Sequence, residues 1–147
     1  MRYVLLSNLF YQKHQCHKEI LKKVNRPYCI VVIKINNIDI GIPFRSNIKH
    51  KYAYYTERRQ DNKLSRAGLD YTKAVVINLN EDVDTTRKAQ IRKEDYKVLL
   101  GKEYIVQKGF EKFLAKYKEA VLYPNRDENK FILANSALQY FHNELGL

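Results

Sequence analysis

The sequence contains no tryptophan, one methionine, two cysteines, five glycines and three prolines. With so little proline and glycine it has no flexible linker, and it shows no repeat or low-complexity tract. We therefore expect a single domain over residues 1–147. Cys16 and Cys29 could pair, but two cysteines in a chain of this size more often stay reduced in a cytosol.

Long hydrophobic runs are also missing. The longest apolar run, around Cys29–Ile33, falls far short of the roughly 20 residues that a membrane-spanning helix needs. The opening MRYVLLSNLFYQKHQ has too short an apolar core for a signal peptide, and no small-residue cleavage site follows it. We interpret it as part of the fold. The sequence contains no P-loop, GxGxxG, GxSxG or HExxH motif.

Acidic residues are few relative to basic ones: 16 Asp and Glu stand against 27 Lys and Arg, a net charge of +11. This excess indicates an anionic partner. A membrane surface is less favoured than nucleic acid, because we find no strongly amphipathic basic helix with Trp or Phe on its apolar side. The apolar share of 45% predicts a globular protein.

The clearest structural pattern is a β-hairpin in YCIVVIKINNIDIGIPF. Asn36-Asn37 suits a two-residue turn that requires positive φ. Folding there places Ile35 opposite Ile38, Ile33 opposite Ile40 and Val31 opposite Ile42 on one face, and Lys34 opposite Asp39 on the other. A slip of one residue would exchange both faces, so the register is well specified.

The remaining patterns predict an α+β domain, with a mostly antiparallel sheet from the first half covered by helices from the second. We expect strands at 2–6, 51–56 and 73–78, and a long surface connection over 57–68. Ser7 is expected to cap a helix through Phe10, His14, His17, Ile20 and Leu21 that ends at 25–27. Further helices are expected at 93–100 and 104–122, with a break allowed at Gly109, followed by a last helix with Phe131, Ala134, Leu138, Phe141 and Leu145 on one stripe.

The basic residues concentrate in Arg45–Lys73, which holds eight Lys or Arg and three Asp or Glu. Tyrosines 52, 54, 55 and 71 are interleaved with them. Cations that bind phosphate, together with aromatic faces that stack on unpaired bases, are typical of single-stranded RNA binding. Solvated surface and half-buried tyrosine packing are the alternative interpretations.

Ser46, Lys49 and His50 add chemical variety to this segment, next to the cations Arg45 and Lys51. Cleavage of RNA by its own 2′-hydroxyl needs a base, an acid and cations on the phosphorane, and no metal or other cofactor. Lys34 would add a cation if it pointed toward the same rim. Asp70 either orients a basic residue at the site or caps a turn, and the sequence leaves both open.

Other constellations are weaker. His14 and His17 would share a helix face while Cys16 points away, so we expect no metal site there. We expect Cys29 in the core and His142 at a helix surface or boundary.

The stretches RPYCIVVIKI, IGIPFRSNIKHKYAYYT and GLDYTKAVVI resemble the toxins of type III toxin–antitoxin systems, in particular the CptN and TenpN branch and, more distantly, ToxN and AbiQ. The resemblance implies a compact, strongly bent antiparallel sheet flanked by helices, distantly like MazF and Kid. It also implies a bacterial, cytoplasmic endoribonuclease that acts without metal and leaves a 2′,3′-cyclic phosphate and a 5′-hydroxyl.

The resemblance further implies a partner. The antitoxin of these systems is a tandem-repeat RNA, which the toxin cuts into pseudoknots that fill its active groove in a protein–RNA hetero-oligomer. The catalytic serine of the family lies in the loop after the hairpin, with a lysine shortly beyond it; here the serine maps to Ser46 and the lysine to Lys49. The chain departs from the ToxN-like pattern at Arg45, where a threonine is expected, and at Ile48, where the lysine is expected.

Because of that departure, Lys49 and His50 are alternatives for proton transfer, while Lys34 would stabilise charge in the transition state. The residues expected to contact the RNA are Arg45, Asn47, Lys51, Tyr54, Arg58, Arg59, Lys63, Arg66 and Lys73. A non-catalytic module that docks on structured RNA explains the charge and the tyrosines equally well. Duplex DNA binding is less supported, because no helix-turn-helix pattern is present.

Overall fold

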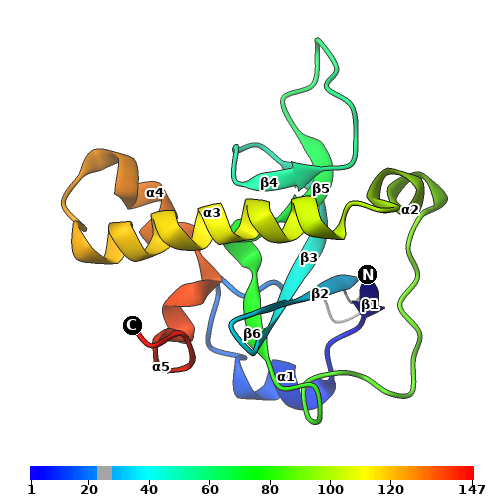
Figure 1. Ribbon diagram of the computed structural model, residues 1–147, viewed down its shortest axis with the longest axis horizontal. Coiled ribbons are helices and arrows are strands. Elements are labelled where there is room, and N and C mark those ends of the chain that lie inside the picture. Colours follow the sequence, from blue (N-terminus) through cyan, green and yellow to red (C-terminus); the bar gives the residue numbers. More distant parts are fainter. Residues whose placement is uncertain (23–27) are drawn as a thin grey trace.

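The computed structural model describes residues 1–22 and 28–147. Within these ranges the chain forms a six-stranded antiparallel sheet and five α-helices, so the predicted α+β class is confirmed (Figure 1). The strands lie in the first half and the long helices in the second. No helix in the described ranges is long and apolar enough to cross a membrane.

The strands are β1 (Arg2–Val4), β2 (Ile30–Ile35), β3 (Ile38–Ile48), β4 (Ala53–Tyr55), β5 (Arg66–Asp70) and β6 (Val75–Ile77). The α-helices are α1 (Asn8–Lys13), α2 (Lys93–Leu99), α3 (Glu103–Leu122), α4 (Asp127–Asn135) and α5 (His142–Leu145). Two short 3₁₀ helices are η1 (Tyr71–Lys73) and η2 (Ala137–Tyr140).

The predicted hairpin is confirmed residue by residue. Asn36 and Asn37 have φ of 48° and 65°, as a two-residue turn between twisted strands requires. The register pairs Ile35 with Ile38, Ile33 with Ile40, Val31 with Ile42 and Lys34 with Asp39. Ile40 and Ile42 are fully buried, so the apolar face of the hairpin lies in the core.

Strand β3 belongs to two parts of the sheet. Its first part pairs with β2 and with β6, and its second part pairs with β5, with a register shift between Arg45 and Ile48. The polar segment that begins at Arg45 is therefore still paired. Pairing with β2 ends at Pro43, and β5 takes over as the partner of β3 from Phe44 onward.

Strand β5 was not predicted and lies partly within the expected connection. It sits between β3 and β4, and its residues Ala67, Gly68 and Leu69 are buried. A Cβ on Gly68 would lie 2.8 Å from the Tyr55 Cα, so only glycine lets β4 approach this closely. Ala67 and Gly68 do not favour a strand by themselves, so the sequence gives no strand pattern here. The strand is stabilised by pairing with β3 on one side and β4 on the other.

The first helix is shorter than predicted. Ser7 caps α1 by accepting a hydrogen bond from the Phe10 N–H, as expected, but α1 ends at Lys13. Beyond it the chain turns, and the His17 ring stacks on Tyr140 with centroids 3.8 Å apart and planes at 6°. This contact with the C-terminal region replaces the expected helical turn. The predicted end at 25–27 lies outside the described residues.

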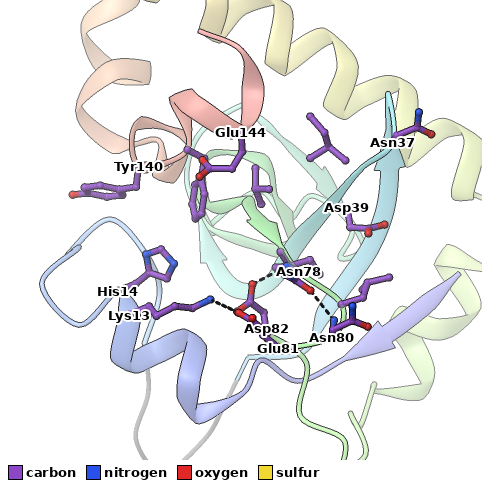
Figure 2. A pocket seen from close by; sticks show the side chains of 15 residues that line it. Lys13, His14, Asn37, Asp39, Asn78, Asn80, Glu81, Asp82, Tyr140 and Glu144 are labelled. Atoms are coloured by element: carbon purple, nitrogen blue, oxygen red, sulfur yellow. Dashed lines mark hydrogen bonds and ion pairs between the residues drawn. The ribbon is translucent and has the colours of Figure 1, made fainter.

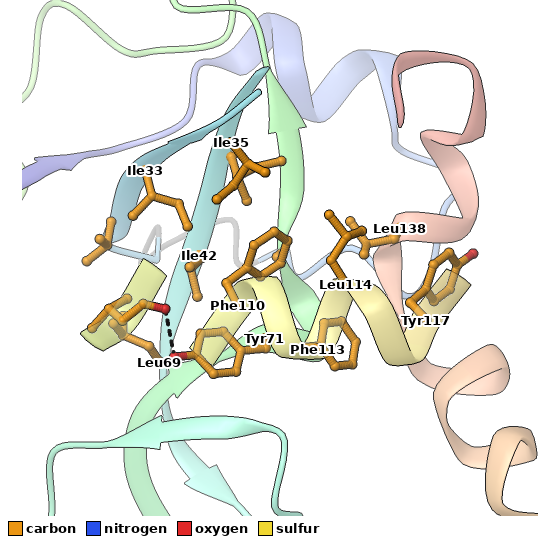
Figure 3. Close-up of a cluster of buried hydrophobic side chains, with 14 of the residues drawn as sticks. Ile33, Ile35, Ile42, Leu69, Tyr71, Phe110, Phe113, Leu114, Tyr117 and Leu138 are labelled. Carbon is orange, nitrogen blue, oxygen red and sulfur yellow. Dashed lines mark hydrogen bonds between the residues drawn. The ribbon is translucent and has the colours of Figure 1, made fainter. Parts of the chain in front are cut away.

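Helices α2 and α3 are confirmed, and α3 passes through Gly109 without a break. A Cβ at Gly109 would overlap the Tyr71 hydroxyl, which donates to the Val106 carbonyl at 3.0 Å. The buried face of α3 packs on the sheet, with Phe110, Phe113 and Leu114 near Ile33, Ile35 and Ile42 (Figure 3). Glycine is therefore required for close packing of Tyr71 on α3.

The predicted last helix is divided. It breaks at Ser136, whose side chain accepts a hydrogen bond from the Leu138 N–H and starts η2. Leu138 and Phe141 are buried as predicted, but Phe131 is 42% exposed and Ala134 is exposed. The prediction that Phe131 and Ala134 are buried is wrong, because the face of α4 that packs against the protein carries Asn129 and Ile132.

Candidate nucleic-acid interface

The carboxylate of Asp70 joins several polar residues at the end of β5. Its side chain is fully buried. The Arg45 guanidinium donates to Oδ2 at 2.7 Å, and His50 Nε2 lies 3.1 Å from Oδ1. The Thr72 hydroxyl and N–H also donate to Oδ1, at 2.6 and 2.9 Å. Asp70 thus orients two basic side chains and caps η1, which combines the two roles that the sequence left open.

Asp70 stays ionised despite its position. Burial on its own raises the pKa of this carboxyl, but the hydrogen bonds from His50, Thr72 and Arg45 outweigh it. The pKa of Asp70 therefore lies below its ordinary value. The charged, fully buried carboxylate holds the partly exposed Arg45 in place through their ion pair.

Both ring nitrogens of His50 are engaged. The Tyr52 N–H donates to Nδ1 at 3.1 Å, so Nδ1 carries the lone pair and Nε2 carries the hydrogen that faces Asp70. In a Ser-His-Asp triad the carboxylate binds one nitrogen and leaves the other free to accept a proton. Here the Tyr52 amide occupies that second nitrogen. In this arrangement His50 positions Asp70 and the turn before β4.

A cationic hollow of about 460 Å³ lies next to His50. It is lined on several sides by basic residues, with one carboxylate among the described lining: Lys49, Lys51, Arg59, Lys63 and Arg66, with Asp61. The Arg66 guanidinium lies 3.7 Å from the centroid of the Tyr55 ring, and Lys63 pairs with Glu57 at 2.6 Å. Among the described residues no ion pair neutralises Lys49, Lys51 or Arg59, so the hollow suits a polyanion.

Ser46 faces a different hollow. It lies exposed in β3, not in a loop after the hairpin, and lines a space of about 250 Å³ with Arg45, Cys29, Arg92 and other residues. Among the residues that the structure describes, this space and the cationic hollow have no lining residue in common. The two hollows are connected through Asp70. Arg45 lines the hollow of Ser46, His50 lines the cationic hollow, and both side chains contact the Asp70 carboxylate.

Cys29 also lines the hollow of Ser46, although we expected it in the core. It is partly exposed and, like Cys16, unpaired. Burial raises the pKa of its thiol to about 12. The thiol is therefore protonated at neutral pH, which argues against a nucleophilic role.

One predicted residue, Lys34, lies away from the Ser46–Lys51 segment. Lys34 sits at the hairpin turn, 3.8 Å from Asp39. At roughly 3.3 Å per residue, β3 runs about 30 Å between Asp39 and Ile48, so the structure does not bring Lys34 to that segment. Arg58 is exposed in the connection between β4 and β5.

The others lie near the segment. Asn47 is exposed in β3, and Tyr54 is half-buried in β4 against the core. Lys73 in η1 donates to the Asn135 carbonyl at 2.8 Å, and its partial burial lowers the pKa of its amine. Sequence reasoning missed Phe131, which lies 5.4 Å from the His50 ring, because its helical spacing suggested a core position.

A third hollow has a lining of the opposite charge. It measures about 740 Å³ and lies by the hairpin turn, between α1, the segment after β6 and the C-terminal region (Figure 2). Acidic side chains dominate its charged lining: Asp39, Glu81, Asp82 and Glu144, with Lys13 and His14. Lys13 donates to Asp82 at 2.7 Å. These carboxylates would repel a phosphate backbone.

The described residues contain no group of three or more His, Cys, Asp or Glu side chains that could hold a metal ion. His14 and His17 contact each other through their Nδ1 atoms at 2.9 Å, and Cys16 is exposed. His142 lies at a helix boundary, where its Nε2 is 2.6 Å from the Tyr117 hydroxyl. Comparison with protein-family models, with curated proteins and with solved structures gave no match to this chain.

Proposed function

We propose that the protein is a metal-independent endoribonuclease toxin of the type III toxin–antitoxin kind, with a ToxN-like bent sheet. The observation that carries the proposal is the arrangement at the far end of β3. There a buried carboxylate fixes Arg45 beside Ser46, and the same carboxylate holds His50 at the edge of the cationic hollow. The exposed Ser46 beside Arg45, together with the cations Lys49, Lys51 and Arg59 of the cationic hollow, supports RNA cleavage, because cations stabilise the charge that develops on the phosphate.

The proposed reaction is a transesterification. The 2′-hydroxyl of the RNA gives up its proton to a base while its oxygen attacks the adjacent phosphorus. The bond to the 5′-oxygen breaks and this oxygen takes up a proton from an acid, so the products carry a 2′,3′-cyclic phosphate and a 5′-hydroxyl. Arg45 stabilises the charge on the phosphorane with the N–H groups that Asp70 leaves free. Ser46 hydrogen-bonds the phosphate, and Lys49 takes part in proton transfer. His50 acts by positioning Asp70 and thereby Arg45.

The partner in this proposal is an RNA antitoxin. A cleaved, pseudoknotted repeat would cover the same basic surface and form a protein–RNA hetero-oligomer in the bacterial cytoplasm. The unpaired cations Lys49, Lys51 and Arg59 support such a contact, since each neutralised phosphate releases counterions.

A second candidate is a non-catalytic RNA-binding module. Two observations favour it: both nitrogens of His50 are engaged, and Ser46 lies outside the cationic hollow. A module would bind RNA with steep salt dependence and leave it intact.

Mapping of RNA ends separates the two. The purified protein is incubated with mixed cellular RNA in EDTA, together with the variants Ser46→Ala and Arg45→Ala. As a matched control we choose Ser65→Ala, which lies in the connection before β5. Discrete fragments with 5′-hydroxyl and cyclic-phosphate ends are expected from the wild type and the control and not from the two variants. Bound but intact RNA would exclude the nuclease and leave the module.

Growth arrest gives a second readout. Expression of the chain without an antitoxin should stop growth, and Ser46→Ala should abolish this effect while it keeps much of the RNA binding. Arrest by Ser46→Ala would contradict the role of this hydroxyl.

A further inference from the structure

Phe131 is an aromatic residue that the fold does not use for its core. It lies on α4 with 42% of its surface exposed, while its neighbour Ile132 is buried. Its ring centroid is 5.4 Å from the His50 ring and 6.1 Å from the Tyr52 ring, and its plane is tilted by 24° from that of Tyr52. Three rings therefore meet where α4 approaches the chain between β3 and β4.

Basic side chains surround these rings. The Lys51 amine lies 5.5 Å from the centroid of Tyr52, and Lys49 is exposed next to His50 in the sequence. Lys73 donates to the Asn135 carbonyl, while the Asn135 side chain donates to the Phe131 carbonyl at 2.8 Å. Through Asn135, the Lys73 amine is therefore held next to the helical turn that carries Phe131.

We infer that Phe131, supported by Tyr52, forms a stacking subsite for one unpaired nucleobase of single-stranded RNA. The flanking phosphates of that nucleotide are held by Lys49 and Lys51. The inference rests on the proposed function and extends it, because it names the residue that receives a base beside the reacting phosphate. A partly exposed aromatic ring packed beside Tyr52, whose own ring has the Lys51 amine nearby, matches a nucleotide, which offers a flat π-surface and a negative charge together.

The chain contains no tryptophan, so a single indole can report on this subsite. We would prepare Phe131→Trp and titrate it with a short 2′-O-methyl RNA, which cannot be cleaved because its 2′-oxygen is blocked. The comparison ligand is an oligomer of the same length and charge that carries abasic sugars. Stacking on a base should quench the indole fluorescence with the first ligand and not with the second.

Tyr104 offers a matched control. Tyr104 is 70% exposed and also has a lysine nearby, with the Lys108 amine 5.4 Å from the centroid of its ring. It lies in the first turn of α3, whereas α4 follows the other end of that helix (Figure 1). Tyr104→Trp should show no quenching specific to bases. Phe131→Ala should bind the base-containing RNA about 5- to 100-fold more weakly, with Tyr104→Ala unchanged and with binding rescued in Phe131→Tyr.

The outcomes separate the inference from the function on which it rests. Normal RNA binding and cleavage by Phe131→Ala, or equal quenching of Phe131→Trp by abasic and base-containing ligands, would overturn the subsite and leave the nuclease proposal intact. If the wild type binds neither ligand and cleaves no RNA, both proposals fail. Tight binding of an apolar peptide or lipid in place of RNA at Phe131→Trp would likewise overturn the inference.

Discussion

The two ends of strand β3 differ in almost every property. Its first part, Ile38–Pro43, pairs with β2 on one side and with β6 on the other and contributes buried isoleucines to the core. The start of this part, by the hairpin turn, lines the acidic hollow. Its second part, Phe44–Ile48, exposes Ser46 and Asn47 and leads into the cationic hollow. One strand thus separates two hollows whose charged linings have opposite sign, so we expect a polyanion to prefer the basic end. We call the two ends of β3 the turn end and the far end.

The largest loss of folding stability is expected from Asp70→Ala, at the far end of β3. The change leaves Arg45 and His50 without their buried partner, and loss of one member of a buried ion pair costs about 3–5 kcal/mol. Urea unfolding measures this loss, and RNA cleavage should disappear with it. Asp82→Ala at the turn end should cost about 1–3 kcal/mol through its lost hydrogen bonds and leave RNA binding intact. Equal loss of RNA binding in both variants would contradict the separation of the two ends.

A smaller loss of folding stability is expected at the contact between α3 and Tyr71, which follows β5 at the far end. Gly109→Ala forces a methyl group against the Tyr71 hydroxyl, and overpacking of this kind costs about 1–3 kcal/mol. Thermal or urea unfolding measures it. Combining the change with Tyr71→Phe, which removes the hydroxyl, should recover part of the loss. A purely additive double variant would mean that Tyr71 is not the residue that Gly109 accommodates.

Acid should weaken the two ends in different pH ranges. At the turn end, burial, followed by the charges of His17 and Lys13, lowers the pKa of His14. The folded state thus favours neutral His14, and stability falls as the pH drops below the ordinary imidazole value of about 6.5. At the far end the pKa of Asp70 is depressed, so its stabilisation is complete above about 4 and is lost as the pH falls further.

The free energy of unfolding, measured against pH, distinguishes these two ranges. His14→Gln should remove the dependence near pH 6, and Asp70→Asn should remove part of the dependence below pH 4, because neither amide titrates. A pH profile that neither substitution changes would contradict both assignments.

The smallest effect concerns the hairpin turn itself. Asn37 has a positive φ, so Asn37→Ala should cost about 1 kcal/mol, whereas Asn37→Gly should be tolerated. RNA cleavage per folded molecule should not change in either variant, since the turn lies at the other end of β3. Reduced cleavage in a fully folded Asn37→Ala sample would show that the two ends are coupled.

The turn end could be predicted from the sequence because its information is local. The alternation of isoleucines and the Asn36-Asn37 pair specify the register within one short segment, and the structure agrees with it. Helix α3 was predictable for the same reason, since its buried residues recur at helical spacing.

The far end could not be predicted because it depends on distant partners. Strand β5 forms from small residues that pair with β3 and β4, and Asp70 gains its role only when this pairing brings Arg45 and His50 to it. Phe131 has core-like spacing, but α4 turns Ile132 and Asn129 inward. The basic and aromatic composition of Arg45–Lys73 was visible in the sequence, while its division into two hollows was not.

Photochemical crosslinking tests the central claim most directly. Uncleavable 2′-O-methyl RNA with 4-thiouridine at single positions would be crosslinked to the wild-type chain, and the modified peptides identified by mass spectrometry. Our account predicts crosslinks in Phe44–Lys73 and around Phe131, which weaken as the salt concentration rises. Crosslinks concentrated at the acid-lined hollow, around His14, Asn78–Asp82 and Glu144, would contradict it.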